Sequence, residues 1–162
     1  MNKRLILVGP TASGKNVMRD RLFNKGFTFD ISYTTRDMRT EVGEQEGIEY
    51  HFISDDEFEI MKDNDEFYEK VEYNGKKYGT GRNEWENKDV FIMEPNGVDC
   101  ILEEDRESCF IIFINPPVEE RIRRMREERK WNNQQVSDRI KTDNKQFAKF
   151  LKYDIKITTP DF

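Results

Sequence analysis

The sequence of 162 residues has few of the residues that mark metal and redox sites. Its single histidine is His51, and its two cysteines, Cys100 and Cys109, form no C-x-x-C pair and no metal-ligand spacing. We therefore expect a structural role for His51 and idle or buried thiols in a reducing compartment. No apolar run approaches the ~20 residues of a membrane span, and residues 5–8 are too short a run for a secretory signal. These absences favour a cytoplasmic protein without a membrane partner.

The sequence also lacks an excess of basic residues. It has 27 Lys and Arg against 33 Asp and Glu, which gives a net charge of −6. Binding to a nucleic-acid backbone requires a basic surface, so we expect no nucleic-acid partner. A small phosphate ligand needs only a local basic pocket. The 12 Phe, 6 Tyr and 2 Trp residues suffice for the core of one domain.

The apolar runs that are present predict an α/β fold with a parallel sheet. Residues 3–8, 89–94 and 109–115 read as buried strands, helices are expected after residue 14 and after Pro116, and residues 153–158 close the chain as a strand. The second of the helices after Pro116 should bury one apolar face, formed by Val136, Ile140, Phe147, Phe150 and Leu151.

The central segment, from about residue 30 to 80, has a different pattern. Residues 27–32 and 48–53 are expected to be strands, and Ser54 with Glu57 forms a capping box that opens a helix. A hairpin should follow over residues 66–80, with Asn74-Gly75 at its turn. We interpret this segment as a subdomain that carries a specific site.

The loop GPTASGKN, residues 9–16, is the first chemical motif. It follows an apolar strand and precedes a helix, and its glycines allow backbone N–H groups to surround a phosphate at the helix N-terminus. Asn16 stands where the G-x-x-x-x-G-K-[ST] pattern has a magnesium-binding hydroxyl. The loop alone leaves three readings open: an enzyme, a binding module without chemistry, and coincidence. The expected phosphate-binding residues are Gly9, Pro10, Thr11, Ala12, Ser13, Gly14, Lys15 and Asn16.

A second motif, SYTTRDMRTEVGEQEGIEYHF at residues 32–52, resembles the guanylate kinase family. The resemblance continues through SDDEF, EFYEKVEYNGKKYGT, INPP and YDIKI, and covers nearly the whole chain. It implies a single domain with a P-loop NTPase-like three-layer core and a parallel sheet, over residues of about 1–31, 82–117 and 151–162. It also implies a small strand-rich GMP-binding subdomain at about 32–81 and a helical lid at about 118–145.

The resemblance assigns most of the subdomain's conspicuous side chains to GMP. Two arginines can grip one phosphate with forked donors, and two tyrosine hydroxyls join them. Glu69 and Glu94 match the acids that meet the donor edge of guanine, and the hydroxyls of Ser32 and Thr80 match those near O6. The implied GMP set is Ser32, Arg36, Arg39, Glu44, Tyr50, Glu69, Tyr78, Thr80 and Glu94.

The implied reaction is phosphorylation of GMP, and of dGMP, by ATP with Mg²⁺. Catalysis would rest on Lys15, on Arg36 and on lid arginines that neutralise charge on the transferred group. The candidates in the lid are Arg124, Arg129 and Arg139, and a slip in register before Met125 leaves Arg123 as the alternative to Arg124. The expected partners are small nucleotides, and the protein is expected to be a monomer or homodimer.

Several departures from the family pattern keep other readings open. Asn16 replaces Ser or Thr, Ile92 replaces an acid, and Thr159 replaces an Asn near adenine. Residues 41–42 are extra, and the sequence ends at Phe162, where the family usually continues with a helix. Asn16 could still bind the metal, indirectly or through its amide oxygen. The alternatives are a non-catalytic guanylate-kinase-like module and a kinase for another nucleoside or deoxynucleoside monophosphate.

Overall fold

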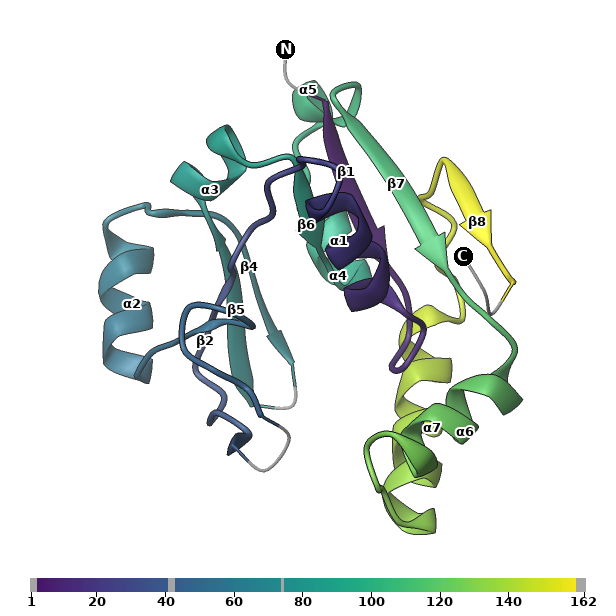
Figure 1. Cartoon of the computed structure of the whole chain (residues 1–162). Helices are drawn as coiled ribbons and strands as arrows, with labels where there is room; N and C mark the ends of the chain where they lie inside the picture. Colours follow the sequence, from purple (N-terminus) through teal and green to yellow (C-terminus); the bar gives the residue numbers. More distant parts are fainter. Residues whose placement is uncertain (1–2, 41–42, 74, 160–162) are drawn as a thin grey trace.

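The fold is built on a four-stranded parallel sheet with the strand order β6-β1-β7-β8 (Figure 1). The structure is a computed structural model, and it describes residues 3–40, 43–73 and 75–159. The strands of this core sheet are β1 (Arg4–Val8), β6 (Val90–Ile92), β7 (Cys109–Ile114) and β8 (Ile155–Ile157). Its helices are α1 (Lys15–Phe23), α3 (Arg82–Asn87), α4 (Pro95–Asp99) and α5 (Glu103–Arg106).

The central strands of this sheet are buried on both faces, which explains their uninterrupted apolar sequences. Ile6, Leu7 and Val8 of β1 are fully buried, although neighbouring side chains point to opposite faces. Ile6 and Val8 belong to a cluster that includes residues of α3 and α4 and the segment after α7, while α1 crosses in front of the sheet (Figure 1). Helices on both faces give the layered α/β architecture expected from the sequence.

A second, smaller sheet lies beside the core and has the order β3-β2-β5-β4. Its elements are β2 (Tyr33–Thr34), β3 (His51–Phe52), β4 (Phe67–Tyr73) and β5 (Lys76–Gly81), with α2 (Asp55–Asp63) packed against it. β4 and β5 form an antiparallel hairpin, and Ser54 caps α2 through the expected capping box. We call residues 33–81 the subdomain.

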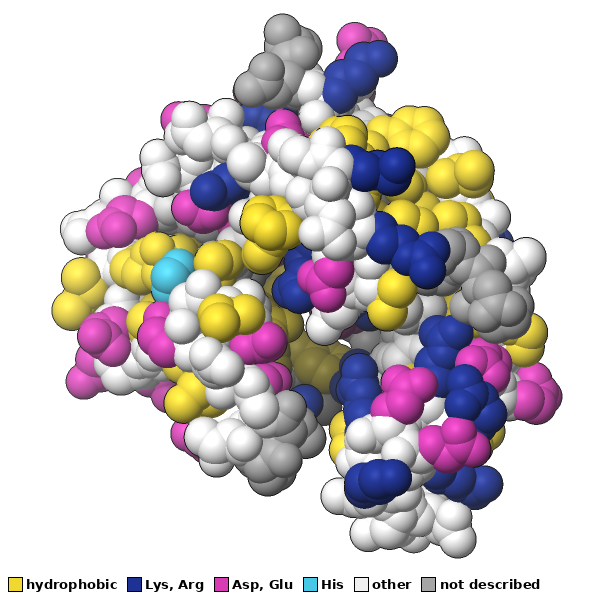
Figure 2. All heavy atoms as spheres, in the orientation of Figure 1, with side chains coloured by type: hydrophobic (Ala, Val, Ile, Leu, Met, Phe, Trp, Pro, Cys, Tyr) yellow, Lys and Arg dark blue, Asp and Glu magenta, His cyan; other side chains and the backbone are white. Residues whose placement is uncertain are grey.

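Two charged helices form the third part of the molecule, α6 (Val118–Glu127) and α7 (Asn133–Phe147). We call them the lid helices. In the space-filling view the surface is hollowed between the subdomain and the lid helices, and Lys and Arg side chains gather around this hollow (Figure 2). Among the described helices, none combines the length and apolar character needed to cross a bilayer.

Three expectations about local structure are wrong in detail. Residues 27–32 form no strand: Phe29 makes one isolated parallel bridge to Val90, because this segment only touches the edge of the core sheet. The strand expected over 48–53 is limited to the two residues of β3. Leu151 is 79% exposed, since α7 ends at Phe147 and the helical periodicity does not extend to it. Asn74 of the expected turn lies outside the described residues.

Candidate functional site

The loop between β1 and α1 has the tight backbone that an anion-binding loop requires. Ala12 and Gly14 both have positive φ angles, of 60° and 105°, and the N–H of Ser13 donates to the carbonyl of Pro10 at 3.2 Å. A Cβ at Gly9 would overlap the carbonyl oxygen of Ile114 at the end of β7. Gly9 therefore lets the loop start directly against the core sheet, at the carboxyl ends of the parallel strands.

Lys15 begins α1 and folds back over this loop. Its ammonium donates to the carbonyls of Gly9 at 2.5 Å and Pro10 at 3.2 Å. Burial lowers the pKa of Lys15, and the carboxylates of Glu94 and Asp143 oppose that shift. The cation is thus held at the mouth of the loop, where an incoming phosphate would replace the two carbonyls as its partner.

Asp143 of α7 binds the same loop and was not singled out from the sequence. It is fully buried, and its carboxylate accepts from the N–H of Thr11 at 3.0 Å and from the Thr11 hydroxyl at 3.1 Å. The same carboxylate accepts from Arg121 at 3.1 Å and from Arg139 at 3.0 Å. One acidic side chain therefore joins the loop to both lid helices.

The lid arginines differ in what they contact. Arg124 donates to the carbonyl of Ala12 at 3.2 Å, whereas Arg123 lies on the outer face of α6 and pairs with Glu120 and Glu127. This placement favours Arg124 over Arg123 as the arginine that faces the loop. Arg139 donates to the Thr11 hydroxyl, and its guanidinium lies 5.9 Å from the ring centre of Tyr73 in the subdomain.

Arg129 lies beyond the end of α6, within electrostatic reach of Arg39 and Arg139. Its guanidinium lies 5.4 Å from the ring centre of Trp131. Burial lowers the pKa of Arg129, and the neighbouring charges of Arg39 and Arg139 lower it further. Cations from the subdomain and from both sides of the lid thus converge on one space, which suits a ligand with several phosphates.

In the subdomain, Arg36 is held in a forked ion pair with Glu44. Its two terminal nitrogens lie 3.0 and 2.8 Å from the two carboxylate oxygens, and its guanidinium lies 5.5 Å from the ring centre of Tyr50. Glu44 also accepts from the backbone N–H of Arg39 at 2.8 Å. Tyr78 lies beside Tyr50, with ring centres 6.0 Å apart, and burial together with Tyr78 raises the pKa of Tyr50 to about 12. The residues that the resemblance assigns to the GMP phosphate are therefore neighbours.

Glu69 and Thr80 form a buried pair across the hairpin of β4 and β5. The Thr80 hydroxyl donates to one carboxylate oxygen of Glu69 at 2.9 Å. The other oxygen is buried and has no hydrogen-bond partner among the described residues. Burial raises the pKa of Glu69, against the effect of its bonds with Thr80. A buried acceptor without a partner is costly, so this oxygen is poised to receive a donor from a ligand.

Ser32 and Glu94 lie outside the subdomain: Ser32 directly precedes β2, and Glu94 directly precedes α4 of the core. The Ser32 hydroxyl donates to Asp30 at 2.5 Å, and Asp30 was not singled out from the sequence. Glu94 precedes α4 and accepts from Gln146 of α7 at 2.8 Å. The expected base-binding side chains thus come from four separate segments.

The expected metal side of the site supplies few ligands. Asn16 is exposed in the first turn of α1, and Ile92 is a half-buried apolar residue at the end of β6. Across the described residues, no group of three or more His, Cys, Asp and Glu side chains could hold a metal ion. The amide oxygen of Asn16 is one oxygen donor that this side of the loop could offer to a cation.

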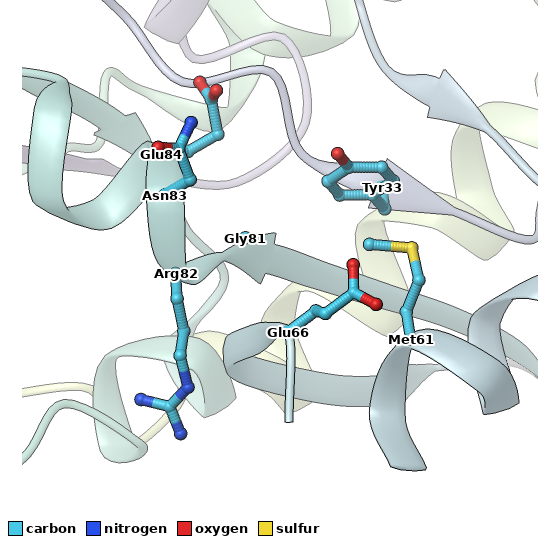
Figure 3. A pocket seen from close by; sticks show the side chains of 7 residues that line it. All are labelled: Tyr33, Met61, Glu66, Gly81, Arg82, Asn83 and Glu84. Atoms are coloured by element: carbon cyan, nitrogen blue, oxygen red, sulfur yellow. The ribbon is translucent and has the colours of Figure 1, made fainter. Parts of the chain in front are cut away.

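The other residues considered from the sequence lie outside this hollow. His51 bonds Glu46 at 2.9 Å, and its ring lies tilted against that of Tyr33 with the ring centres 4.8 Å apart. Cys109 is buried, Cys100 is exposed, and both are free thiols. A cavity of about 280 Å³ lies on another side of the subdomain, where Met61, Glu66 and Tyr33 approach one another and Arg82 points away (Figure 3). None of the expected substrate residues lines it.

This chain is similar to known proteins in its sequence and in its fold. The family model described as "Guanylate kinase" matches residues 1–162. A guanylate kinase of Prochlorococcus marinus is 31% identical over 169 positions, covering 99% of this chain and 91% of the relative. The crystal structure of guanylate kinase from Anaplasma phagocytophilum matches with a TM-score of 0.72 and 25% identity, covering 99% of this chain and 78% of that one. MAGUK p55 subfamily member 7 of Danio rerio is 32% identical over 138 positions, covering 77% of this chain but 23% of the relative.

Proposed function

Because this chain belongs to the guanylate kinase family, we propose that it transfers the γ-phosphoryl group of ATP to GMP or dGMP. The products are ADP and the nucleoside diphosphate. The observation that carries the proposal is the position of Arg139, which bonds Thr11 of the phosphate loop and also lies over Tyr73 of the subdomain. A donor bound at the loop and an acceptor bound in the subdomain would meet beside this cation.

The donor site is the loop of residues 9–16. Its N–H groups would surround the β- and γ-phosphates of ATP, and the first turn of α1 would add its partial positive charge. Lys15 would exchange the carbonyls of Gly9 and Pro10 for phosphate oxygens. Arg124 and Arg139 would then neutralise the charge that develops on the transferred group, together with Arg129.

The acceptor site is assigned to the subdomain. Arg36 and Arg39 would bind the GMP phosphate, with the hydroxyls of Tyr50 and Tyr78 as further donors. Glu44 fixes the Arg36 guanidinium through its two terminal nitrogens, so little side-chain freedom would be lost when the remaining N–H groups bind a phosphate. This arrangement would leave one phosphate oxygen free to attack the γ-phosphorus in line.

The base would be recognised by Glu69 and its neighbours. The unpartnered oxygen of Glu69 is a suitable acceptor for the N1–H or N2–H₂ of guanine, and Glu94 would accept a further donor. The hydroxyls of Ser32 and Thr80 would meet the carbonyl at position 6. Adenine presents an amino group there and has no hydrogen on N1, so we expect AMP to be a poor acceptor.

No covalent enzyme intermediate is needed for this reaction. Positioning of the two phosphates, charge neutralisation and exclusion of water would supply the rate. Movement of the lid helices and the subdomain toward each other would remove water, which would otherwise hydrolyse ATP.

Mg²⁺ would enter with ATP and would be held chiefly by phosphate oxygens and water. Mg²⁺ commonly keeps several waters and takes few protein ligands, so a site with few protein donors, such as the Asn16 amide oxygen, is compatible with it. When bound, the ion neutralises charge on the β- and γ-phosphates.

A non-catalytic binding module is the second candidate. The altered residues Asn16 and Ile92 favour it, and a MAGUK protein is among the relatives that this chain resembles. The retention of Lys15, Arg36 and Glu69 in this sequence supports the kinase instead, because a module without chemistry has no need of all three.

A coupled assay of ADP release separates the candidates. ATP and Mg²⁺ are supplied with GMP, dGMP, AMP, UMP, CMP or dTMP in turn. We expect turnover with GMP and dGMP. Measurable GMP binding without turnover on any acceptor would favour the binding module, and a preference for a pyrimidine would contradict the role of Glu69.

A further inference from the structure

Asp30 lies between the core sheet and the subdomain and is absent from the roles assigned above. Its backbone N–H donates to the carbonyl of Val90 at 2.9 Å, which ties it to the core sheet. One carboxylate oxygen accepts from the Ser32 hydroxyl at 2.5 Å. The other oxygen is buried and has no hydrogen-bond partner among the residues that the structure describes.

The pair Asp30–Ser32 has the same form as the pair Glu69–Thr80. Each carboxylate holds one hydroxyl and leaves one buried oxygen without a partner. Glu69 gains a donor from the base at its unpartnered oxygen in the proposed complex. Asp30 gains no such donor, so its hold on Ser32 depends on its own protonation state.

The hydroxyl of Ser32 has a single hydrogen to donate. When Asp30 is ionised, it can only accept, and the Ser32 hydrogen is used by the carboxylate. When Asp30 is protonated, its O–H can donate to the Ser32 oxygen, and the Ser32 hydrogen becomes free. Two hydrogen bonds then follow one another: Asp30 donates to Ser32, and Ser32 donates to an acceptor on the ligand. Such consecutive bonds strengthen each other.

We propose that Asp30 is a positioning residue that decides, through Ser32, whether the site can donate a hydrogen bond to a carbonyl at position 6 of the acceptor base. This inference rests on the proposed function, because that function places Ser32 at this position. Protonated Asp30 selects a six-carbonyl purine such as guanine. Ionised Asp30 leaves only lone pairs on Ser32 and removes that selection.

The surroundings of Asp30 bring the pKa of its carboxyl group close to neutral pH. Burial raises the pKa of Asp30 to about 7, and its hydrogen bond with Ser32 opposes the shift. The charged groups that act on it are Glu84 of α3, Glu69 of β4 and the cation of Lys88. Glu84 lines the neighbouring cavity (Figure 3). The two acids favour the protonated form of Asp30, and Lys88 opposes it.

Binding measurements test the inference without depending on catalysis. GMP and 6-thioguanosine 5′-monophosphate keep the same N1–H and N2–H₂ groups, and they differ in the acceptor at position 6, where sulfur is the weaker one. Calorimetry between about pH 6 and about pH 8 gives both dissociation constants and the protons taken up on binding. The proteins compared are the wild type, Asp30→Asn and Ser32→Ala.

For the wild type we expect GMP to be preferred roughly three- to tenfold over the thio analogue below about pH 7, which is the worth of one neutral hydrogen bond. The preference should fall toward unity at higher pH, where GMP binding should also take up a proton. The introduced asparagine side chain cannot titrate in Asp30→Asn. The preference of this variant for GMP should therefore not change with pH, and no proton should be taken up at this position. Titration of the GMP phosphate is common to all three proteins and is removed by comparing them.

Ser32→Ala separates a relay through Ser32 from a direct effect of charge. It keeps the titrating Asp30 and removes the hydroxyl, so its preference should be low at every pH. A preference that still changes with pH in Ser32→Ala would overturn the relay, as would a wild type whose preference is constant. Failure of the proposed function would look different, as absence of GMP binding or of turnover at any pH.

Discussion

The buried carboxylate of Asp143 binds both the backbone N–H and the hydroxyl of Thr11, 132 positions earlier in the chain. It also holds Arg121 of α6 and Arg139 of α7. Asp143 thereby fixes the lid helices to the phosphate loop and sets the position of the Arg139 guanidinium beside that loop.

Asp143→Ala should therefore lower both stability and donor binding. It leaves the buried Arg121 unpaired, and we expect a loss of about 3–5 kcal/mol in the free energy of unfolding. Asp143→Asn should lose less, because an amide can still accept from Thr11. In both variants KM for ATP should rise more than KM for GMP. Urea unfolding and steady-state kinetics measure these effects.

Asp138→Ala is the matched control on the same helix. Asp138 is exposed and bonds Gln134 within α7. We expect a change below about 0.5 kcal/mol. Equal effects of the two alanine substitutions would show that Asp143 has no special role in joining the lid to the loop.

Much of the fold was predictable because several of its signals are local. The uninterrupted apolar sequences of β1 and β7 indicated a parallel sheet, and the capping box of Ser54 and Glu57 marked the start of α2. The two-residue strands β2 and β3 were not predictable to their ends. Their extent depends on pairing with β5 and with each other, which the local sequence does not encode.

The buried charges of the lid were missed for a physical reason. Asp143 lies at helical spacing from Val136, Ile140 and Phe147, on the stripe that we predicted to be apolar. A charged residue on such a stripe is a signal for a buried ion pair, but the partner comes from another helix. Arg121, 22 positions earlier, is identified as that partner only once α6 and α7 are packed together.

Asp30 also predicts a pH dependence of stability. Its pKa is raised by burial to about 7 in the folded protein, against an unfolded value of about 3.9. Between these values the folded state binds more protons than the unfolded state, so stability falls as pH rises from about 4 to about 7. We expect Asp30→Asn to remove most of this fall, about 3–4 kcal/mol. Urea unfolding at several pH values gives the slope, and equal slopes in the two proteins would contradict the burial of an ionisable Asp30.

Arg36→Lys tests whether Arg36 can hold Glu44 and the acceptor phosphate at the same time, through different N–H groups. Lysine keeps the charge but cannot make two parallel hydrogen bonds. We expect KM for GMP to rise roughly tenfold or more, with KM for ATP little changed. Arg126→Lys on the exposed face of α6 is the control and should leave both constants unchanged. A larger rise in KM for ATP than in KM for GMP would contradict the assignment of Arg36 to the acceptor.

Lys15→Ala tests the division between donor and acceptor sites. Lys15 donates its hydrogen bonds within the described residues to the phosphate loop, at the carbonyls of Gly9 and Pro10. We expect kcat to fall roughly a hundred- to a thousandfold, while the dissociation constant of GMP changes little. Calorimetry with GMP and the coupled assay measure the two quantities, and Lys25→Ala beyond the end of α1 serves as the control. An equal loss of GMP affinity would argue against the assigned roles.

Asn16→Ser tests how the donor's magnesium is held. A serine hydroxyl at this position can bind Mg²⁺ directly, and Asn16 is exposed, so the substitution should not disturb the loop. We expect kcat/KM for ATP to be unchanged or higher, with half-maximal activity at a lower Mg²⁺ concentration. Val17→Ser adds a hydroxyl at the next position of the same turn and should leave the magnesium dependence unchanged. A large loss of activity in Asn16→Ser alone would show that the asparagine itself serves the metal or the loop, and that this chain has replaced the usual hydroxyl with an amide ligand.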